Sequence, residues 1–333
     1  MLRNFNLSLV IFVMMVFFVI SFITNIIGPL IPQFIKTYDL SLILASFLPL
    51  SFFFSYGVFS IPAGIYLERY GGKIVMCTAF LISSLGAAII IIIPGYLSFI
   101  VSFFLIGTGM AILQVAINPL LRFAVSGEHF AFFSIIGQLA FGSASFLSPI
   151  FYKFLLDNNN FLGLSLFGDE PWLWIYLLFI VSVSTLILFL FSLKIPDNKM
   201  DSEKFDFRIF SSFLKSRFSY FYFFGIFCYV GVEQGINNWS SEFLYQYHSL
   251  DPAVVGVEVI SAFWGNLTIG TVINLFLIKL FDEKKLLNFY AISSSIIILL
   301  ALHSYSEVSV ISFKILGFSI SGIWSLMISL GLN

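Results

Sequence analysis

Residues Gly64 to Lys73, with the sequence GIYLERYGGK, separate two long apolar runs of the chain. The stretch carries Glu68 and Arg69 at its centre, and ten residues are too few to cross, as a helix, a hydrocarbon core about 30 Å thick. Glycines such as Gly71 allow the backbone to bend sharply and helix ends to approach closely. The stretch therefore predicts a tight turn between two spanning helices, on one face of a membrane.

Composition places the whole chain in a membrane. Of its 333 residues, 59% are hydrophobic and 10% are charged, whereas about 25% of the residues of a soluble domain are charged. Because so few charges cannot cover so much apolar surface, we predict an all-α, polytopic membrane protein embedded in a lipid bilayer. The formal net charge of −1 gives no reason to expect a nucleic-acid partner.

Ten apolar runs are long enough to span a bilayer, for which a helix needs about 20 residues. The predicted spans are residues 7–31, 42–62, 74–94, 97–120, 130–154, 172–193, 218–244, 253–278, 286–303 and 307–331. One long polar segment divides six spans from four. The predicted domains are therefore a six-helix bundle (1–194), a linker (195–217) and an incomplete bundle of four helices (218–333).

Basic residues orient these spans. Thirteen of the 16 Lys and Arg residues fall on one predicted face, Lys36 and Lys153 fall on the other, and Lys314 lies inside a span. Since cytoplasmic loops carry an excess of basic residues, the N-terminus and the linker are predicted to be cytoplasmic, in an inner or plasma membrane.

The charged turn has a weak counterpart later in the chain. Span 2, its turn and span 3 recur as span 8, a turn at residues 279–285, and span 9. Repeats of this kind build transporters whose substrate site lies between two bundles near the bilayer midplane.

The charged turn also resembles a family signature. It is similar to the loop G-x-L-x-D-R-x-G-R-K of major facilitator superfamily transporters, with Glu68 for the usual Asp and Gly72 for a basic residue. Three further segments resemble the fucose/glucose/galactose permease branch: LQVAINPL (113–120), YVGVEQGINNW (229–239) and SAFWGNLTIG (261–270). The resemblance covers spans 1 to 10.

That resemblance implies a secondary transporter that moves a hexose-type sugar by alternating access, coupled to a proton or a sodium ion. It assigns a conformational, gating role to the turn residues Gly64, Glu68, Arg69, Gly71 and Lys73. A full-length member has six plus six spans, so the sequence looks truncated or is a naturally shortened member.

Two acids tied to proton coupling in that branch are absent. The position in span 1 is Gly28 and the position in span 4 is Gln114. The fucose-type proton mechanism therefore does not carry over, and coupling is expected to centre on Glu233.

Two ionisable residues lie deep inside predicted spans. Glu233 lies about 24 Å from the cytoplasmic end of span 7, and Lys314 about 12 Å below the outer face in span 10. Intramembrane charges are costly and usually face a cavity or a partner. We hypothesise that the two side chains pair across the cavity and take part in coupling. Alternatively, Lys314 snorkels to the outer surface and Glu233 only fixes helix packing. Acids near the outer ends of spans 7 and 8, Glu242 and Glu258, are interpreted as solvated.

A sugar site needs amides, which both donate to and accept from hydroxyls, and flat aromatic faces for the C–H side of the ring. The Gly- and Asn-rich stretch after Glu233 also predicts an interrupted helix near the outer end of span 7. Alternatively, membrane amides bond neighbouring helices and tryptophans lie at the interface. The predicted substrate-binding residues are Asn25, Gln114, Asn118, Gln138, Gln234, Asn237, Trp239, Trp264, Asn266 and Trp324.

No chemistry-bearing motif points to an enzyme. The sequence has no phosphate-binding Walker loop and no nucleophile–base constellation, so neither a catalytic residue nor a cofactor is predicted. Cys77 and Cys228 lie in apolar runs and are interpreted as packing residues, with no metal site. Two alternatives to sugar transport stay open: a truncated, non-transporting remnant, and an efflux carrier of the same superfamily for another small molecule.

Overall fold

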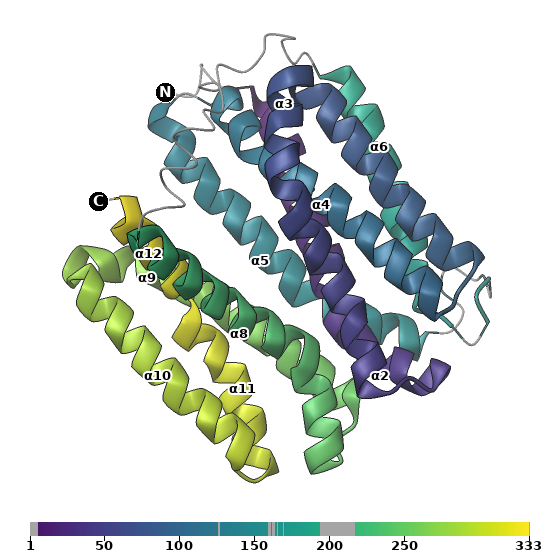
Figure 1. Cartoon of the computed structure of the whole chain (residues 1–333), viewed down its shortest axis with the longest axis vertical. Helices are drawn as coiled ribbons and strands as arrows, with labels where there is room; N and C mark the ends of the chain where they lie inside the picture. The colour runs from purple at the N-terminus through teal and green to yellow at the C-terminus, as the bar shows by residue number, and fades with distance from the viewer. Residues whose placement is uncertain are drawn as a thin grey trace. The chain divides into compact units, whose positions relative to one another are not determined.

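A computed structural model of the chain describes residues 6–125, 127–158, 161, 164, 166–168, 170–193 and 217–332. Its regular elements are helices, which confirms the all-α prediction (Figure 1). They are α1 (Leu7–Asn25), α2 (Ile27–Tyr38), α3 (Leu42–Ile92), α4 (Tyr96–Ala124), α5 (Gly127–Asp157), α6 (Leu173–Ser192), α8 (Arg217–His248), the π-helical turn η2 (Pro252–Gly256), α9 (Val257–Leu280), α10 (Glu283–His303), α11 (Ser306–Ile320) and α12 (Ile323–Leu332).

Eight segments of the described chain are long and apolar enough to cross a membrane. One of them, α3, has 51 residues, which would make a straight helix about 76 Å long, more than twice the thickness of the hydrocarbon core. The helix is divided at Gly71 and so supplies two of the predicted spans. The 32-residue helix α8 is not among the eight, because polar side chains such as Glu233 and Asn237 lower its hydropathy. With α8 and both arms of α3, the helices correspond to the ten predicted spans.

The ten-residue turn predicted at 64–73 is wrong in extent. Residues 64–70 continue the helix, and the break lies at Gly71 alone, with φ 78° and ψ 162°. A residue with a Cβ rarely adopts this conformation, which glycine reaches at little cost. On the second arm, Lys73 Nζ donates to the carbonyl oxygens of Phe191 (3.4 Å) and Leu193 (3.5 Å) at the end of α6, where a cation stabilises the carbonyl end of a helix.

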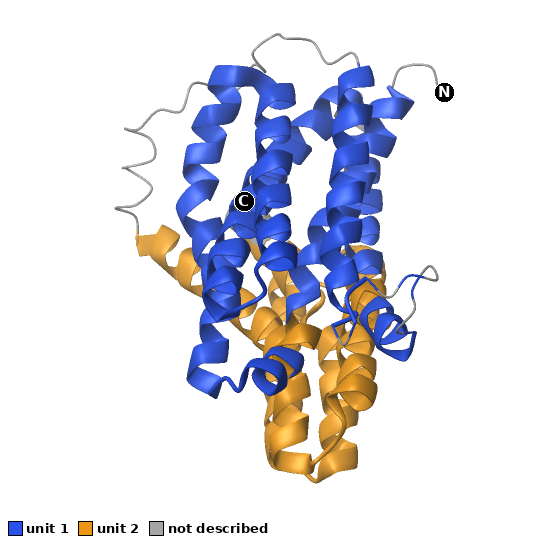
Figure 2. Ribbon diagram, turned by 90° about the vertical axis from the view of Figure 1, so that its right-hand side faces the viewer, with its two compact units in different colours: residues 1–27, 33–144, 151–204 blue, residues 28–32, 145–150, 205–333 orange. Residues whose placement is uncertain are grey.

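The chain divides into two compact units, coloured separately in Figure 2. Unit 1 comprises residues 1–27, 33–144 and 151–204, and unit 2 comprises 28–32, 145–150 and 205–333. The predicted linker lies outside the described residues, apart from Arg217, where α8 begins. Within unit 1, α4 packs against α1 and α3. Within unit 2, α11 packs in the same way against α8, α9 and α10.

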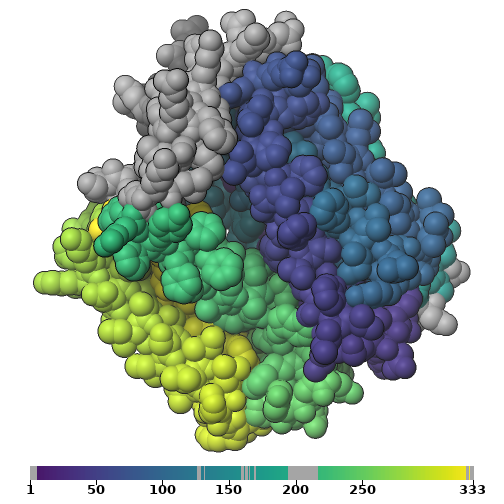
Figure 3. Space-filling model, in the orientation of Figure 1, coloured from purple at the N-terminus to yellow at the C-terminus, as the bar shows by residue number. Residues whose placement is uncertain are grey.

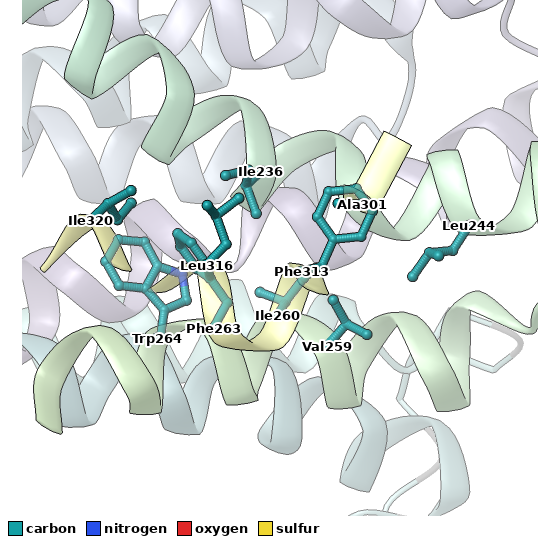
Figure 4. Packing of buried hydrophobic residues seen from close by; sticks show 10 residues of the cluster. All are labelled: Ile236, Leu244, Val259, Ile260, Phe263, Trp264, Ala301, Phe313, Leu316 and Ile320. Carbon is teal, nitrogen blue, oxygen red and sulfur yellow. The ribbon is translucent and has the colours of Figure 1, made fainter. Parts of the chain in front are cut away.

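The core of unit 2 is an apolar cluster between α8, α9 and α11, with α10 contributing at its edge (Figure 4). Because lipid tails are as apolar as these side chains, close van der Waals packing rather than removal from water holds the cluster together. The cluster fixes the face that α9 presents to α8, and with it the position of the indole of Trp264. Its buried members are Ile236, Leu244, Val259, Ile260, Phe263, Trp264, Ala301, Phe313, Leu316 and Ile320.

A first prediction concerns the break in α3. Replacing Gly71 by Ala should lower the free energy of unfolding by about 1 to 3 kcal/mol, because a Cβ strains the backbone at this φ and ψ. Gly64→Ala is the matched control: a Cβ there meets nothing within 4 Å and helix propensity then favours Ala by up to about 1 kcal/mol. Thermal unfolding in detergent, followed by intrinsic fluorescence, measures both. Equal melting temperatures for the two variants would contradict the assignment of the break to Gly71.

Candidate functional site

The carboxyl group of Glu233, in the middle of α8, accepts hydrogen bonds from two neutral side chains of the same helix. The hydroxyl of Tyr229 donates to Glu233 Oε2 at 2.6 Å, and Gln234 Nε2 donates to Glu233 Oε1 at 3.1 Å. The carboxyl is only partly exposed, and no ion pair to it is present in the described part of the chain. A carboxyl in this setting can gain or lose a proton without breaking a salt bridge.

The hypothesised pair of Glu233 with Lys314 is wrong in this structure. Lys314 Nζ instead contacts Glu258 Oε1 at 2.5 Å, with 24% of the Lys314 side chain and 63% of the Glu258 side chain exposed. Glu258 lies in the first turn of α9, a helix that packs closely against α11. The interpretation of Glu258 as a merely solvated acid is corrected by the same contact.

Trp264 lies in the core rather than on an open face. Its side chain is 2% exposed, and its Nε1 donates to Asn237 Oδ1 at 2.7 Å. The ring is therefore not available as an aromatic face for a sugar, and the prediction that it binds substrate is wrong in this structure. What the indole does is fix the amide of Asn237, so that the oxygen is occupied and the nitrogen is left as the donor.

Two atoms of neighbouring amides on α8 are buried with no hydrogen-bond partner in the described chain: Asn237 Nδ2 and Gln234 Oε1. An unsatisfied buried polar group costs about 1 to 3 kcal/mol, so these atoms are candidates for a ligand hydroxyl or a water molecule. The two residues are three apart and so neighbours on one helix face. The predicted interruption of the helix here is wrong, since α8 runs unbroken from Arg217 to His248.

The remaining candidates in unit 2 have other surroundings. Asn266 Nδ2 donates to the backbone oxygen of Lys314 at 2.8 Å, so this amide joins α9 to α11. Trp239 lines an apolar groove beside Phe243. Trp324 is exposed, and its ring centroid lies 6.2 Å from that of Tyr229.

Unit 1 carries its own polar candidates. Gln114 and Asn118 are both exposed on α4, four residues apart and thus on one face. The hydroxyl of Tyr56 on α3 donates to Gln114 Oε1 at 3.1 Å. Gln138 is exposed on α5. Asn25 differs from these, since it is fully buried and its Nδ2 donates to the Ser21 carbonyl at 3.0 Å, as expected of an amide that serves helix packing.

Gly28 occupies the span-1 position at which the permease branch has an acid. It belongs to unit 2, and a Cβ added to it would overlap the backbone carbonyl of Asn237. This position therefore has no room for an acidic side chain.

Sequence reasoning missed three contacts of the site. Tyr56 and Tyr229 each donate to a predicted site residue, Gln114 and Glu233. The sequence carried a signal only for Tyr229, which lies four residues before Glu233 and so on the same helix face. Glu242 was interpreted as solvated, yet it is 3% exposed and accepts from Gln246 Nε2 at 2.7 Å. Cys228 was interpreted as a packing residue but is exposed, and both cysteines are free.

The predicted gate residues lie around the break in α3. The guanidinium of Arg69 lies 5.4 Å from the centroid of the Tyr70 ring, and Glu68 and Lys73 are partly exposed. Among the described residues, no group of three or more His, Cys, Asp or Glu side chains could hold a metal ion.

Comparison with known proteins gives a consistent result. A family model, the Major Facilitator Superfamily, matches residues 13–333. A glucose/galactose transporter of Brucella abortus is 24% identical over 328 residues, which cover 96% of this chain and 78% of the relative. The L-fucose-proton symporter of Escherichia coli is 25% identical over 348 positions, covering 95% and 78%. A crystal structure of the Escherichia coli fucose:proton symporter superposes with a TM-score of 0.68 at 21% identity, covering 97% of this chain and 83% of that one.

A second prediction tests the indole–amide hydrogen bond. Trp264→Phe removes the donor and leaves Asn237 Oδ1 buried without it, which should cost about 1 to 3 kcal/mol of unfolding free energy beyond the loss of ring volume. Trp172→Phe is the matched control, because Trp172 is equally buried and its Nε1 has no partner in the described chain. Denaturant titration in detergent measures both variants. If Trp172→Phe is as destabilising as Trp264→Phe, the hydrogen bond contributes nothing.

A third prediction tests the ion pair. Lys314→Glu alone places a second acid beside Glu258 and should cost about 0.5 to 1 kcal/mol, because the Glu258 side chain is largely exposed to its surroundings. Adding Glu258→Lys should restore the stability, whereas adding Glu233→Lys or Glu307→Lys should not. The readout is the free energy of unfolding of the four variants. Restoration by Glu233→Lys would return Lys314 to the partner first hypothesised.

Proposed function

We propose that this chain, which belongs to the Major Facilitator Superfamily, moves a hexose-type sugar across a cell membrane by alternating access. The observation that carries the proposal is the agreement of named relatives over nearly the whole chain, two of them a glucose/galactose transporter and an L-fucose-proton symporter. The likeness in structure supports the fold. The polar side chains on α8 and α4 supply the chemistry that a sugar requires.

On α8, we assign sugar binding to Asn237 as a donor and to Gln234 as an acceptor. Their unpartnered atoms, Nδ2 and Oε1, are adjacent on the helix and suit two neighbouring hydroxyl groups of a hexose. Trp264 acts through Asn237 by fixing its amide and is a positioning residue. On α4, Gln114 and Asn118 form a second pair of amides, with Tyr56 orienting Gln114.

Coupling is assigned to Glu233, with a proton as the coupling ion. The position at which relatives in this branch have an acid is Gly28, where no side chain fits, so the acid of α8 is the candidate that remains. When its Oε1 binds a proton, that oxygen becomes a donor and a weaker acceptor, which weakens the hydrogen bond from Gln234 Nε2. Protonation would thus loosen the side chain whose Oε1 is assigned to the sugar, which links proton binding to substrate binding.

The arrangement around these residues is proposed on sequence grounds. The segments 1–194 and 218–333 act as two bundles joined by a cytoplasmic linker, with the N-terminus on the same side. The turn residues Glu68, Arg69 and Lys73 take part in gating, as their resemblance to the signature loop implies. Gly71 supplies the backbone break that this gating needs.

A fourth prediction tests both transport and coupling. In proteoliposomes, an inward proton gradient should drive accumulation of radiolabelled glucose, galactose or fucose. Glu233→Gln is nearly isosteric and keeps one acceptor oxygen for the donors on Tyr229 and Gln234, but it cannot carry a proton, so gradient-driven accumulation should fall at least tenfold while exchange of sugar for sugar persists. Glu307→Gln, at an exposed acid on α11, is the control and should transport normally.

Each result of this experiment has a definite meaning. Absence of both uptake and exchange in the unmodified protein would favour a non-transporting remnant. Export of an unrelated compound without sugar uptake would favour an efflux carrier. A dependence on a sodium gradient, unchanged by Glu233→Gln, would remove the proton from the mechanism.

A further inference from the structure

Three side chains in the middle of α8 are joined by hydrogen bonds. The first turns of this helix, teal-green in Figure 3, lie at the surface of the molecule, whereas Tyr229, Glu233 and Gln234 are each partly buried. The hydroxyl of Tyr229 lies 2.6 Å from Glu233 Oε2, and Gln234 Nε2 lies 3.1 Å from Glu233 Oε1. The two oxygens of one carboxyl therefore have different partners, one a hydroxyl and the other an amide.

Tertiary packing fixes the hydroxyl of Tyr229. Its ring packs against the apolar cluster of unit 2. The ring centroid of Trp324, on α12, lies 6.2 Å from that of Tyr229, with 35° between the ring planes. Because Tyr229 is four residues before Glu233, the two side chains also lie on one face of α8. A ring held in this way keeps its hydroxyl directed at Glu233 Oε2.

The two partners differ in what they can do when the carboxyl binds a proton. A proton on Oε2 would be donated to the oxygen of Tyr229, so the phenolic hydrogen would have to turn to another acceptor. Within the described chain, the contact with Oε2 is the hydrogen bond that this hydroxyl makes, and a buried hydrogen without an acceptor is costly. A proton on Oε1 displaces only the longer hydrogen bond, from Gln234. The geometry therefore favours Oε1.

The displaced amide hydrogen is then available to the substrate. Gln234 Nε2 can donate to one sugar hydroxyl, and its unpartnered Oε1 can accept from another. The sugar thus replaces the hydrogen bond that proton binding removes. Each ligand strengthens the binding of the other, and this coupling is reciprocal by thermodynamic necessity. A proton on Glu233 Oε2 would leave the contact with Gln234 in place and would have no such effect.

Within unit 2, other charged groups do not reach Glu233. The elements that pack most closely against α8 are η2, α9, α11 and α12, and no ion pair joins any described residue of them to Glu233. Lys314 is paired with Glu258 instead. Besides Glu233, the charged side chains and the histidine of α8 and these elements are Arg217, Glu242, His248, Glu258, Lys279, Glu307 and Lys314.

We propose that Tyr229 is a positioning residue that directs the coupling proton to Glu233 Oε1. This role rests on the proposed function and deepens it, because Tyr229 becomes the residue through which proton binding raises the affinity for the sugar. Tyr229 acts through Glu233 by occupying Oε2. The proton comes from water on the side of higher proton concentration, forms an O–H bond at Oε1, and returns to water on the other side.

The test measures the affinity for sugar at two pH values without a gradient. Exchange of radiolabelled glucose, galactose or fucose is followed in proteoliposomes with equal pH on both sides, and the half-saturating concentration is determined at pH 6 and pH 8. The unmodified protein should bind about fivefold more tightly at pH 6. In Tyr229→Phe, Oε2 is open to the proton and Gln234 keeps its contact. Its affinity at both pH values should equal that of the unmodified protein at pH 8.

Three controls assign the effect. Glu233→Gln should abolish the pH dependence, which identifies Glu233 as the titrating group. Tyr222→Phe removes a hydroxyl seven residues earlier on the same face of α8 and should keep the ratio of the unmodified protein. Circular dichroism and gel filtration monitor the fold of each variant. A folding defect would weaken sugar binding at both pH values, whereas the proposed role weakens it at pH 6 alone.

Three outcomes would overturn the proposal. If Tyr229→Phe keeps the full ratio between pH 6 and pH 8 while Glu233→Gln loses it, the proposed function stands and Tyr229 has no part in it. If Tyr229→Phe loses affinity equally at both pH values, its hydroxyl serves only the structure. Absence of exchange, or of any pH dependence, in the unmodified protein would instead remove the proposed transport or its proton, and the role of Tyr229 with it.

Discussion

A polar side chain inside a bilayer must find its hydrogen-bond partner within the protein, and this constraint governs unit 2. The indole of Trp264 reaches Asn237, and Tyr229 and Gln234 both reach Glu233. Because each of these contacts uses one specific atom of an amide or carboxyl, it also decides which atoms are left over. The leftover donor of Asn237 and acceptor of Gln234 are the atoms to which we assign sugar binding.

The same constraint explains where an acid can lie. At Gly28 the backbone carbonyl of Asn237 leaves no space for a side chain. At position 233 a carboxyl is accommodated because two neutral groups of its own helix approach it. The close approach of the Asn237 backbone therefore excludes a side chain at position 28, whereas neighbours on the same helix accommodate the acid at position 233.

The two units use one packing scheme to different extents. In each, a central helix, α4 or α11, packs against a pair of helices joined by a short charged connection and against the first helix of the unit. Unit 1 adds α6 to this arrangement, and Lys73 ties the charged connection to the end of that helix. Among the described residues of unit 2 no helix takes this place, and α8 and α10 leave apolar side chains such as Phe227 and Ile292 exposed.

Hydropathy in the sequence by itself determined the helical class and about ten spans, because burial of apolar residues in lipid is a property of local composition. The family was indicated by the resemblance of the motifs at 64–73, 113–120, 229–239 and 261–270. Hydropathy and charge also identified Glu233, Gln234 and Asn237 as unusual at their depth. Depth along a helix, however, does not specify which way a side chain faces. For that reason the partner of Lys314 was wrong, and Trp264 was assigned to an open face.

Only the tertiary structure decided those contacts, because the rotation of α9 and α11 about their axes follows from the packing of Phe263, Phe313 and Leu316 in the core between them. The same is true of the sharp break at Gly71, where a single backbone conformation replaced a predicted loop.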